Sequence, residues 1–207
     1  MRKRVSSTRC HIIDVAVVLL AEGEGDEIHV VDIAREADVG IQSIYYHFGS
    51  LSRLIAEAQL STYLRFSEPL HALLLATELA VIENDEPKFW QSIGDDVRLA
   101  WSYGYGGDAR KTSRLLIDIN SDAMTHRDFT ELLDIEFERW IKVIDAGKLL
   151  GWVYSDLDTS ALIASCWGGL NGQSIFSGTS IVHYTPETIR DFWLEIAMAK
   201  RGGVCRD

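Results

Sequence analysis

Cysteine and proline are scarce in this chain of 207 residues, which has three of each. Cys10, Cys166 and Cys205 lie far apart and form no Cys-x-x-Cys pair, so the sequence indicates neither a disulfide framework nor a zinc site. The six histidines are scattered as well, and none lies three to five residues from another, as helical metal motifs require. We therefore predict no metal and no other cofactor, and a chain suited to a reducing compartment.

Long apolar runs are also missing. No stretch approaches the roughly 18 uninterrupted apolar residues of a membrane-spanning helix. Three basic residues, Arg2, Lys3 and Arg4, precede an apolar segment in the manner of a signal peptide, but Asp14 interrupts that segment and its apolar residues form a one-sided stripe. We expect a cytoplasmic protein with no membrane partner.

Catalytic motifs are likewise absent. The sequence has no Gly-x-Ser-x-Gly elbow and no paired Cys and His, and its Gly104-x-Gly106-Gly107 lacks the last glycine of a dinucleotide fingerprint. Asp118 and Asp122 have the spacing of an acid/base pair on a helix, but such carboxylates are more commonly solvated. We predict that the chain is not an enzyme, with a small-molecule enzyme as the less favoured alternative.

Helical periodicity of apolar residues runs through most of the sequence, and no segment has the alternation of a strand. The breaks between periodic segments divide the chain into about ten helices. These include separate helices near residues 51–58 and 70–81 and another over 112–124. With 47% apolar residues the chain has ample material for a core. We predict an all-α fold.

Residues 29–48 have the pattern of a helix-turn-helix. Four apolar residues line one face of a short helix, namely Val30, Ile33, Ala34 and Ala37. Asp38-Val39-Gly40 then interrupts that helix, and we expect Gly40 to supply the permissive backbone of the turn. The second helix carries polar and aromatic side chains but no carboxylate, which suits contact with base edges and phosphates.

The order and spacing of several pieces resemble the tetracycline-repressor-like (TetR) family of transcriptional regulators over about residues 6–66. These pieces are Asp32-Ile33-Ala34, Ala37, Val39 and Ser43-Ile44-Tyr45-Tyr46-His47-Phe48, followed by Leu54. The resemblance implies an N-terminal three-helix DNA-binding domain over residues 6–66 and a larger helical effector-binding and dimerisation domain over 67–207. It also implies a homodimeric regulator, typically a repressor, that a small molecule releases from a palindromic operator. The alternative is a helical protein-interaction module that does not bind DNA.

The sequence departs from the family pattern at three positions. The family usually has a hydroxyl residue where Ile28 stands, a glycine where Asp38 stands, and a phosphate-binding lysine where Leu51 stands. Helix capping and phosphate binding are therefore expected to differ at these points.

The formal charge of −11 is unevenly distributed along the chain. Residues 1–66 hold seven basic against nine acidic residues, and the first eleven positions hold four basic residues and no acidic one. Such a cationic arm can contact phosphate or the minor groove, or it can be only a solubilising terminus. The predicted contacts to double-stranded DNA are made by Arg2, Lys3, Arg4, His29, Gln42, Ser43, Tyr45, Tyr46 and His47.

The larger domain is rich in aromatic residues, which either fill a core or line a cavity. As the resemblance implies, we expect a small amphiphilic or aromatic effector to contact Trp101, Tyr103, Asn120, Trp140, Trp167 and Asn171. A helix near residues 160–177 is rich in small residues, which indicates a close helix-helix contact. That contact lies either within one chain or in a dimer interface that we assign to Phe137, Gly168 and Gly172.

Overall fold

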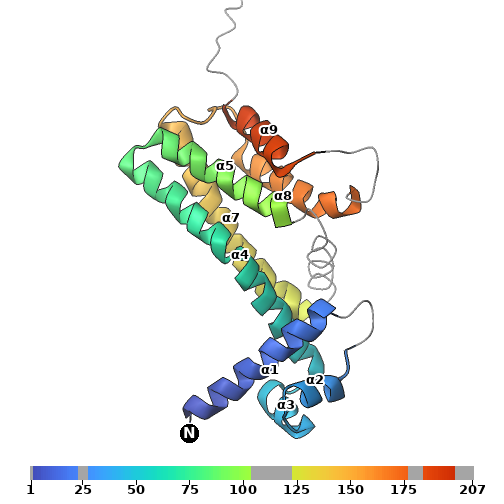
Figure 1. Cartoon of the computed structure of the whole chain (residues 1–207). Helices are drawn as coiled ribbons and strands as arrows, with labels where there is room; N and C mark the ends of the chain where they lie inside the picture. The colour runs from blue at the N-terminus through green and yellow to red at the C-terminus, as the bar shows by residue number, and fades with distance from the viewer. Residues whose placement is uncertain (1, 23–27, 104–122, 177–183, 199–207) are drawn as a thin grey trace, which may run out of the picture. The chain divides into compact units, whose positions relative to one another are not determined.

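The computed structural model describes residues 2–22, 28–103, 123–176 and 184–198. These residues form α-helices joined by short connections, and no strand occurs among them (Figure 1). The helices are α1 (Arg2–Glu22), α2 (Val30–Glu36), α3 (Ile41–Phe48), α4 (Leu51–Glu83), α5 (Glu86–Tyr103), α7 (Ala123–Leu149), α8 (Thr159–Phe176) and α9 (Pro186–Met198). The predicted all-α fold is thus confirmed.

Two of the predicted helices are in fact one. The segments near 51–58 and 70–81 belong to α4, which continues through Pro69. A proline inside a helix removes one backbone hydrogen bond and costs about 3 kcal/mol. Buried residues on both sides of it, among them Tyr63 and Leu74, supply packing that outweighs this cost. The predicted helix over 112–124 falls almost entirely outside the described residues.

By its internal contacts the chain divides into two units. The first comprises Met1–Ser67 with Leu115–Phe129, and the second comprises Glu68–Arg114 with Thr130–Asp207. The core of the first unit takes two or more buried side chains from each of four helices. They are Ile12 and Ala16 of α1, Ile33 and Ala34 of α2, Ile44 and Phe48 of α3, and Leu54 and Ala58 of α4.

The core of the second unit joins α4, α5 and α7 with the turn after α7. Its fully buried centre is Phe89, whose ring lies 5.2 Å from that of Trp152. A Cβ atom on Gly147 would come within 2.8 Å of Phe89 and 2.9 Å of Val153, so this glycine allows a close approach that a larger residue would block. The other buried members are Leu74, Ala80, Ile93, Val143 and Ile144.

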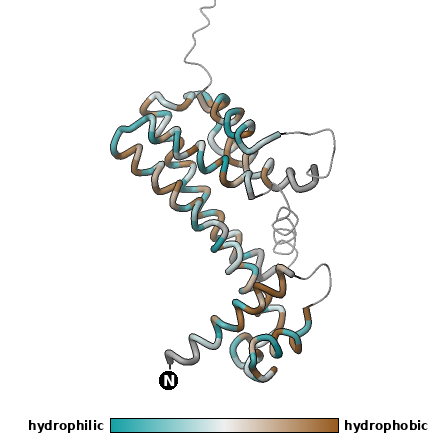
Figure 2. The backbone as a smooth tube through the Cα atoms, viewed as in Figure 1, coloured by the Kyte–Doolittle hydropathy of each residue, from teal (hydrophilic) through white to brown (hydrophobic). Residues whose placement is uncertain are grey.

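Apolar and polar positions intermix along the helices, as expected where one side of each helix packs on a core (Figure 2). Within the described ranges, no helix combines the length and the apolar character that crossing a membrane requires.

Candidate nucleic-acid interface

The turn between α2 and α3 depends on Asp38. Its φ is +51°, in the left-handed region, where glycine is favoured and aspartate is tolerated better than most residues. Gly40 has φ −71° and ψ 145°, an extended conformation open to any residue, and a Cβ atom placed on it would meet nothing within 4 Å. The prediction that Gly40 supplies the permissive backbone is therefore wrong. Asp38 is the residue that adopts the left-handed backbone, and it occupies the position where the family usually has glycine.

Helix α3 is anchored by Ile44 and Phe48, which are both buried in the first core. The Gly40 carbonyl accepts a hydrogen bond from the Ser43 amide at 2.8 Å, but no side chain caps the helix. A helix of eight residues is unstable alone, so these two anchors and the neighbouring helices hold it in place.

The opposite face of α3 is open to solvent. Tyr46 is 79% exposed and Tyr45 is 45% exposed, and Gln42 is exposed in the first turn. Ser43 and His47 are half-buried, and the His47 ring lies 5.2 Å from that of Tyr46. No carboxylate stands on this helix. The structure thus gathers five of the predicted DNA-binding residues on one short helix.

The N-terminus of α2 shows one of the sequence departures. His29 is its N-cap residue and is exposed, and its side chain makes no capping hydrogen bond. At the start of α4, Leu51 packs against the first core. The family's phosphate-binding lysine is therefore replaced by a residue that stabilises the fold.

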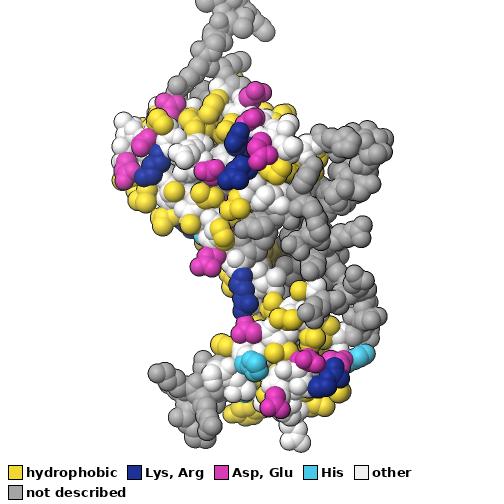
Figure 3. Space-filling view, viewed as in Figure 1, with side chains coloured by type: hydrophobic (Ala, Val, Ile, Leu, Met, Phe, Trp, Pro, Cys, Tyr) yellow, Lys and Arg dark blue, Asp and Glu magenta, His cyan; other side chains and the backbone are white. Residues whose placement is uncertain are grey.

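Each arginine whose side chain is described between residues 7 and 67 is paired with a carboxylate. Arg9 and Arg53 both bind Glu57, and Arg65 binds Asp14. Arg35 contacts Asp32 at 2.9 Å and Glu36 at 3.4 Å. On the face shown in Figure 3, basic and acidic side chains lie in small mixed groups. Little of the positive charge described in this stretch is thus left uncompensated.

Arg2, Lys3 and Arg4 are predicted to form a cationic arm. Their backbone instead belongs to the first turn of α1. Arg9, further along the same helix, is committed to Glu57 and also lies over the Phe48 ring at 5.1 Å. Contact of Arg2, Lys3 and Arg4 with DNA stays a prediction.

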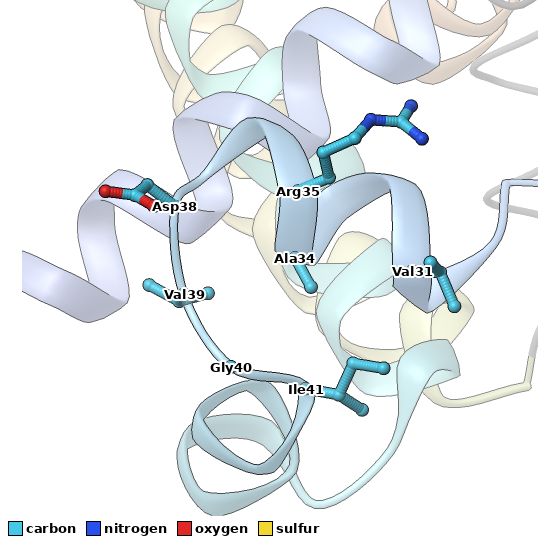
Figure 4. Close-up of a pocket in the computed structure, with 7 residues that line it drawn as sticks. All are labelled: Val31, Ala34, Arg35, Asp38, Val39, Gly40 and Ile41. Atoms are coloured by element: carbon cyan, nitrogen blue, oxygen red, sulfur yellow. The ribbon is translucent and has the colours of Figure 1, made fainter.

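A surface hollow of about 420 Å³ lies between α2 and α3 (Figure 4). Val31 and Ile41 lie on the same side of it, and both are exposed, at 55% and 39%. Arg35 and Asp38 line it with their charged ends directed away from Ile41. An exposed apolar side chain in the first turn of α3 can contact a thymine methyl group. Sequence reasoning gave Ile41 no role.

In the second unit, the predicted effector-binding residues that are described pack against different neighbours. Trp101 is buried against Gly169, where a Cβ atom would lie 3.1 Å from its ring. Trp167 packs on Phe137 with 5.3 Å between ring centroids. Trp140 packs against the second core, which gives it a structural role. Asn120 and the side chains of Tyr103 and Asn171 lie outside the described residues, and the effector assignments stay predictions.

The predicted dimer residues are also placed only in part. A Cβ atom on Gly168 would meet nothing within 4 Å, so this position on α8 faces open space in the protomer. Phe137 is half-buried against Trp167 of the same chain. The surroundings of Gly172 lie outside the described residues.

Sequence reasoning missed a set of polar groups inside the second unit. Glu136 is only 6% exposed and is hydrogen-bonded to His71 Nε2. Burial and the nearby charge of Glu136 raise the pKa of Asp96 to about 8. In the sequence, each of these residues looks like an ordinary helical charge. No spacing signal could have found them, because they come from three different helices.

A short helix that follows a tight turn, exposes polar and aromatic side chains and buries its other face against α1, α2 and α4 has the arrangement of a helix-turn-helix DNA-binding domain. Residues 12–58 match the family model for bacterial regulatory proteins of the tetR family. The chain therefore carries the DNA-binding domain of this family of regulators, whose members are not enzymes.

Solved structures of regulators share the fold along nearly the whole chain. A tetR-family regulatory protein from Rhodococcus RHA1 has a TM-score of 0.60 at 17% identity, covering 92% of this chain and 95% of that one. FadR from Bacillus subtilis, in complex with stearoyl-CoA, has a TM-score of 0.59 at 17% identity, covering 92% and 97%. A protein from Saccharomonospora viridis, described as a transcriptional regulator and in complex with choline, has a TM-score of 0.61 at 19% identity, covering 91% and 94%. A comparison with curated proteins finds no match.

Proposed function

We propose that this regulator acts as a homodimeric repressor whose two α3 helices enter successive major grooves of a palindromic operator, about 34–36 Å apart. The main support for this proposal is the exposed face of α3. Gln42, Tyr45 and Tyr46 are exposed on this helix, whereas Ile44 and Phe48 are buried. Base edges are read by hydrogen-bonding side chains on such a face, and phosphates by hydroxyl and imidazole groups. We infer that the chain acts in the cytoplasm, where the DNA of a bacterium lies.

The dimer contact is assigned to α8. Its residues Ala161, Ala164, Ser165 and Gly168 are all exposed and recur at helical spacing, so they form one face of small side chains. A face of this kind lets a second helix approach closely. Because Gly168 has open space in the protomer, a partner helix is what would fill it.

Effector binding is assigned to the second unit. Relatives with the same fold have been solved with stearoyl-CoA and with choline, so helical domains of this type accommodate quite different ligands. In this chain Trp101 and Trp167 come from different helices and are packed against α8 and α7. A bound effector would favour one arrangement of the two DNA-binding units over another, and it can do so only through different affinities for the two.

Selection of bound sequences from a random DNA pool tests the proposal. An enriched palindrome would establish sequence selectivity and symmetry together. The matched control is the Gln42→Ala/Tyr46→Ala variant, which removes exposed side chains and leaves Ile44 and Phe48 in place. It should keep its helical content and lose enrichment. A wild-type chain that enriches no motif would overturn the proposal and favour a protein-interaction module.

A further inference from the structure

Two exposed apolar side chains line the hollow between α2 and α3. Val31 lies in the first turn of α2 and Ile41 in the first turn of α3. Val31 is 55% exposed and Ile41 is 39% exposed, and Figure 4 shows both side chains on the same side of the hollow. Single apolar side chains are common on protein surfaces, but two that line one hollow from different helices indicate a contact surface.

The core of the first unit does not use these two side chains. It takes Ile33 from α2 and Ile44 and Phe48 from α3. Within the described part of the unit, Val31 and Ile41 belong neither to this core nor to the partly buried residues packed against it. Apolar surface that stays in water gains no free energy from burial, so only a partner that covers the hollow would make these side chains stabilising.

The charged groups of the hollow are directed elsewhere. Arg35 is bound to Asp32 at 2.9 Å and to Glu36 at 3.4 Å. The charged ends of Arg35 and Asp38 both point away from Ile41 (Figure 4). The part of the hollow beside Ile41 is therefore apolar, and it fits an apolar group better than a charged or hydrogen-bonding one, which would lose its water there.

This apolar surface continues the exposed face of α3. Gln42 is exposed next to Ile41 in the same helical turn, and Tyr45 and Tyr46 are exposed further along the helix. No carboxylate stands on α3, so nothing on this helix repels the phosphates of DNA. Continuity with this face favours the edge of a DNA base as the occupant of the hollow over an apolar segment of a protein.

The chemistry of the major groove identifies the base. The C5-methyl of thymine is the apolar group among base edges that otherwise present hydrogen-bond donors and acceptors. Val31 and Ile41 have no hydrogen-bonding group in their side chains, so they can select a base only by covering this methyl. The neighbouring Gln42 carries the amide that pairs with N6 and N7 of adenine. Together these side chains suit a half-site in which thymine and adenine lie close together.

We propose that Val31 and Ile41 bind the C5-methyl group of a thymine in each operator half-site and set the preference for thyminine's methyl-bearing edge over cytosine at that position. Cytosine lacks the methyl and presents an amino donor beside it, which an apolar surface leaves without an acceptor. This inference deepens the proposed function, because it rests on α3 entering the major groove, and it names the base and the chemical group that are read.

Replacement of thymine by deoxyuridine tests the proposal, because it removes the C5-methyl and leaves base pairing unchanged. Fluorescence anisotropy measures the affinity of the full-length protein for the operator enriched from the random pool. It is compared with copies in which each thymine in turn is replaced by deoxyuridine in both half-sites. At one symmetric position the replacement should weaken binding about 15-fold, which is about fourfold for each methyl that is no longer buried.

A double variant tests which side chains read the methyl. Val31→Ala/Ile41→Ala should bind the thymine and deoxyuridine operators equally, because the side chains that cover the methyl are truncated. The matched control is Val18→Ala in α1, which makes the same truncation at a residue that is 53% exposed and does not line the hollow. It should keep the full preference for thymine. Thermal melting shows whether each variant folds, and neither change touches the core.

Unchanged wild-type affinity after deoxyuridine replacement at every thymine would overturn the proposal. An equal loss in the wild type and in Val31→Ala/Ile41→Ala would also overturn it, because another group would then read the methyl. The selection step separates the two levels of inference. A chain that enriches a palindrome without distinguishing thymine from deoxyuridine loses only the methyl site, whereas one that enriches no motif loses the proposed function and this inference with it.

Discussion

Asp38 has a left-handed backbone, with φ +51°, two residues before Gly40, which is extended with φ −71°. Asp38 therefore adopts the left-handed conformation, whereas Gly40, which could adopt it without strain, does not. Gly40 instead occupies the N-cap of α3, where its lack of a side chain leaves the helix without a capping hydrogen bond. A glycine at position 38 and a polar capping residue at position 40 would each stabilise the turn.

Exchanging these residue types should stabilise the first unit. Asp38→Gly relieves the left-handed backbone and should raise the free energy of unfolding by about 0.5–1 kcal/mol. Gly40→Ser supplies a hydroxyl to cap α3 and should raise it by a similar amount, about 0.5–1 kcal/mol. Urea denaturation followed by circular dichroism measures both. Asp38→Ala is the opposing control and should lower stability. A stabilising Asp38→Ala, or a destabilising Gly40→Ser, would contradict this account of the turn.

The exposed first turn of α3 leads to a prediction about base readout. Gln42→Ala should weaken operator binding by about 1–3 kcal/mol and relax the preference at one base pair in each half-site. Tyr46→Phe should weaken binding to all sequences alike, because a hydroxyl contact to phosphate carries no base information. Titration of single-base operator variants distinguishes the two patterns. Unchanged selectivity after Gln42→Ala would move the reading face elsewhere.

The pairing of the arginines in the first unit leads to a prediction about salt. Since Arg9, Arg35, Arg53 and Arg65 are bound to carboxylates, we expect Arg2, Lys3 and Arg4 to be the main source of phosphate contacts. Replacing these three by Ala should lower the slope of log affinity against log salt concentration by about one for each phosphate that is no longer bound. Fluorescence anisotropy over a salt series measures the slope. A slope that does not change would show that phosphate is bound by other groups.

The helices of this protein were largely predictable from sequence, because their apolar stripes report which side is buried. The same signal placed Ile44 and Phe48 in the core and left Gln42 and Tyr46 outside, as the structure has them. The continuity of α4 through Pro69 was not predictable, since tertiary packing overrides the local preference.

The turn and the interior of the second unit were harder to predict for a different reason. A sequence shows which residue permits a left-handed backbone but not which position adopts it, so sequence reasoning favours Gly40 over Asp38. Asp96 and Glu136 look like ordinary helical carboxylates, and only the packing of the helices reveals that Glu136 is buried and that burial raises the pKa of Asp96.

The buried carboxyl group should make stability depend on pH. The pKa of Asp96 is raised to about 8 in the folded protein by burial and by Glu136, against 3.8 as the ordinary value. Below about pH 4 the group is protonated in both states and has no effect. Between about pH 4 and 8 the folded state holds a proton that the unfolded state has lost, so this group lowers the free energy of unfolding by up to about 1.4 kcal/mol per pH unit.

Asp96→Asn should remove this contribution. The difference in unfolding free energy between variant and wild type should grow in the variant's favour from pH 5 to pH 7. Urea denaturation at several pH values measures it, and the surface variant Asp95→Asn should show no such trend. A constant difference across the range would mean that Asp96 is already ionised in the folded protein.

Substitutions at Gly168 and Gly169 should distinguish an effect on dimerisation from an effect on the stability of the protomer. Gly168→Leu places a large side chain where the protomer has nothing within 4 Å, so the chain should fold normally. If this face of α8 meets its copy, the added bulk overpacks the interface, and sedimentation at micromolar concentration should show monomers that no longer bind a palindrome. Gly169→Leu instead collides with the Trp101 ring, because a Cβ atom at this position would lie only 3.1 Å from it, and should lower the melting temperature. A dimeric Gly168→Leu protein with full operator affinity would place the interface on another helix.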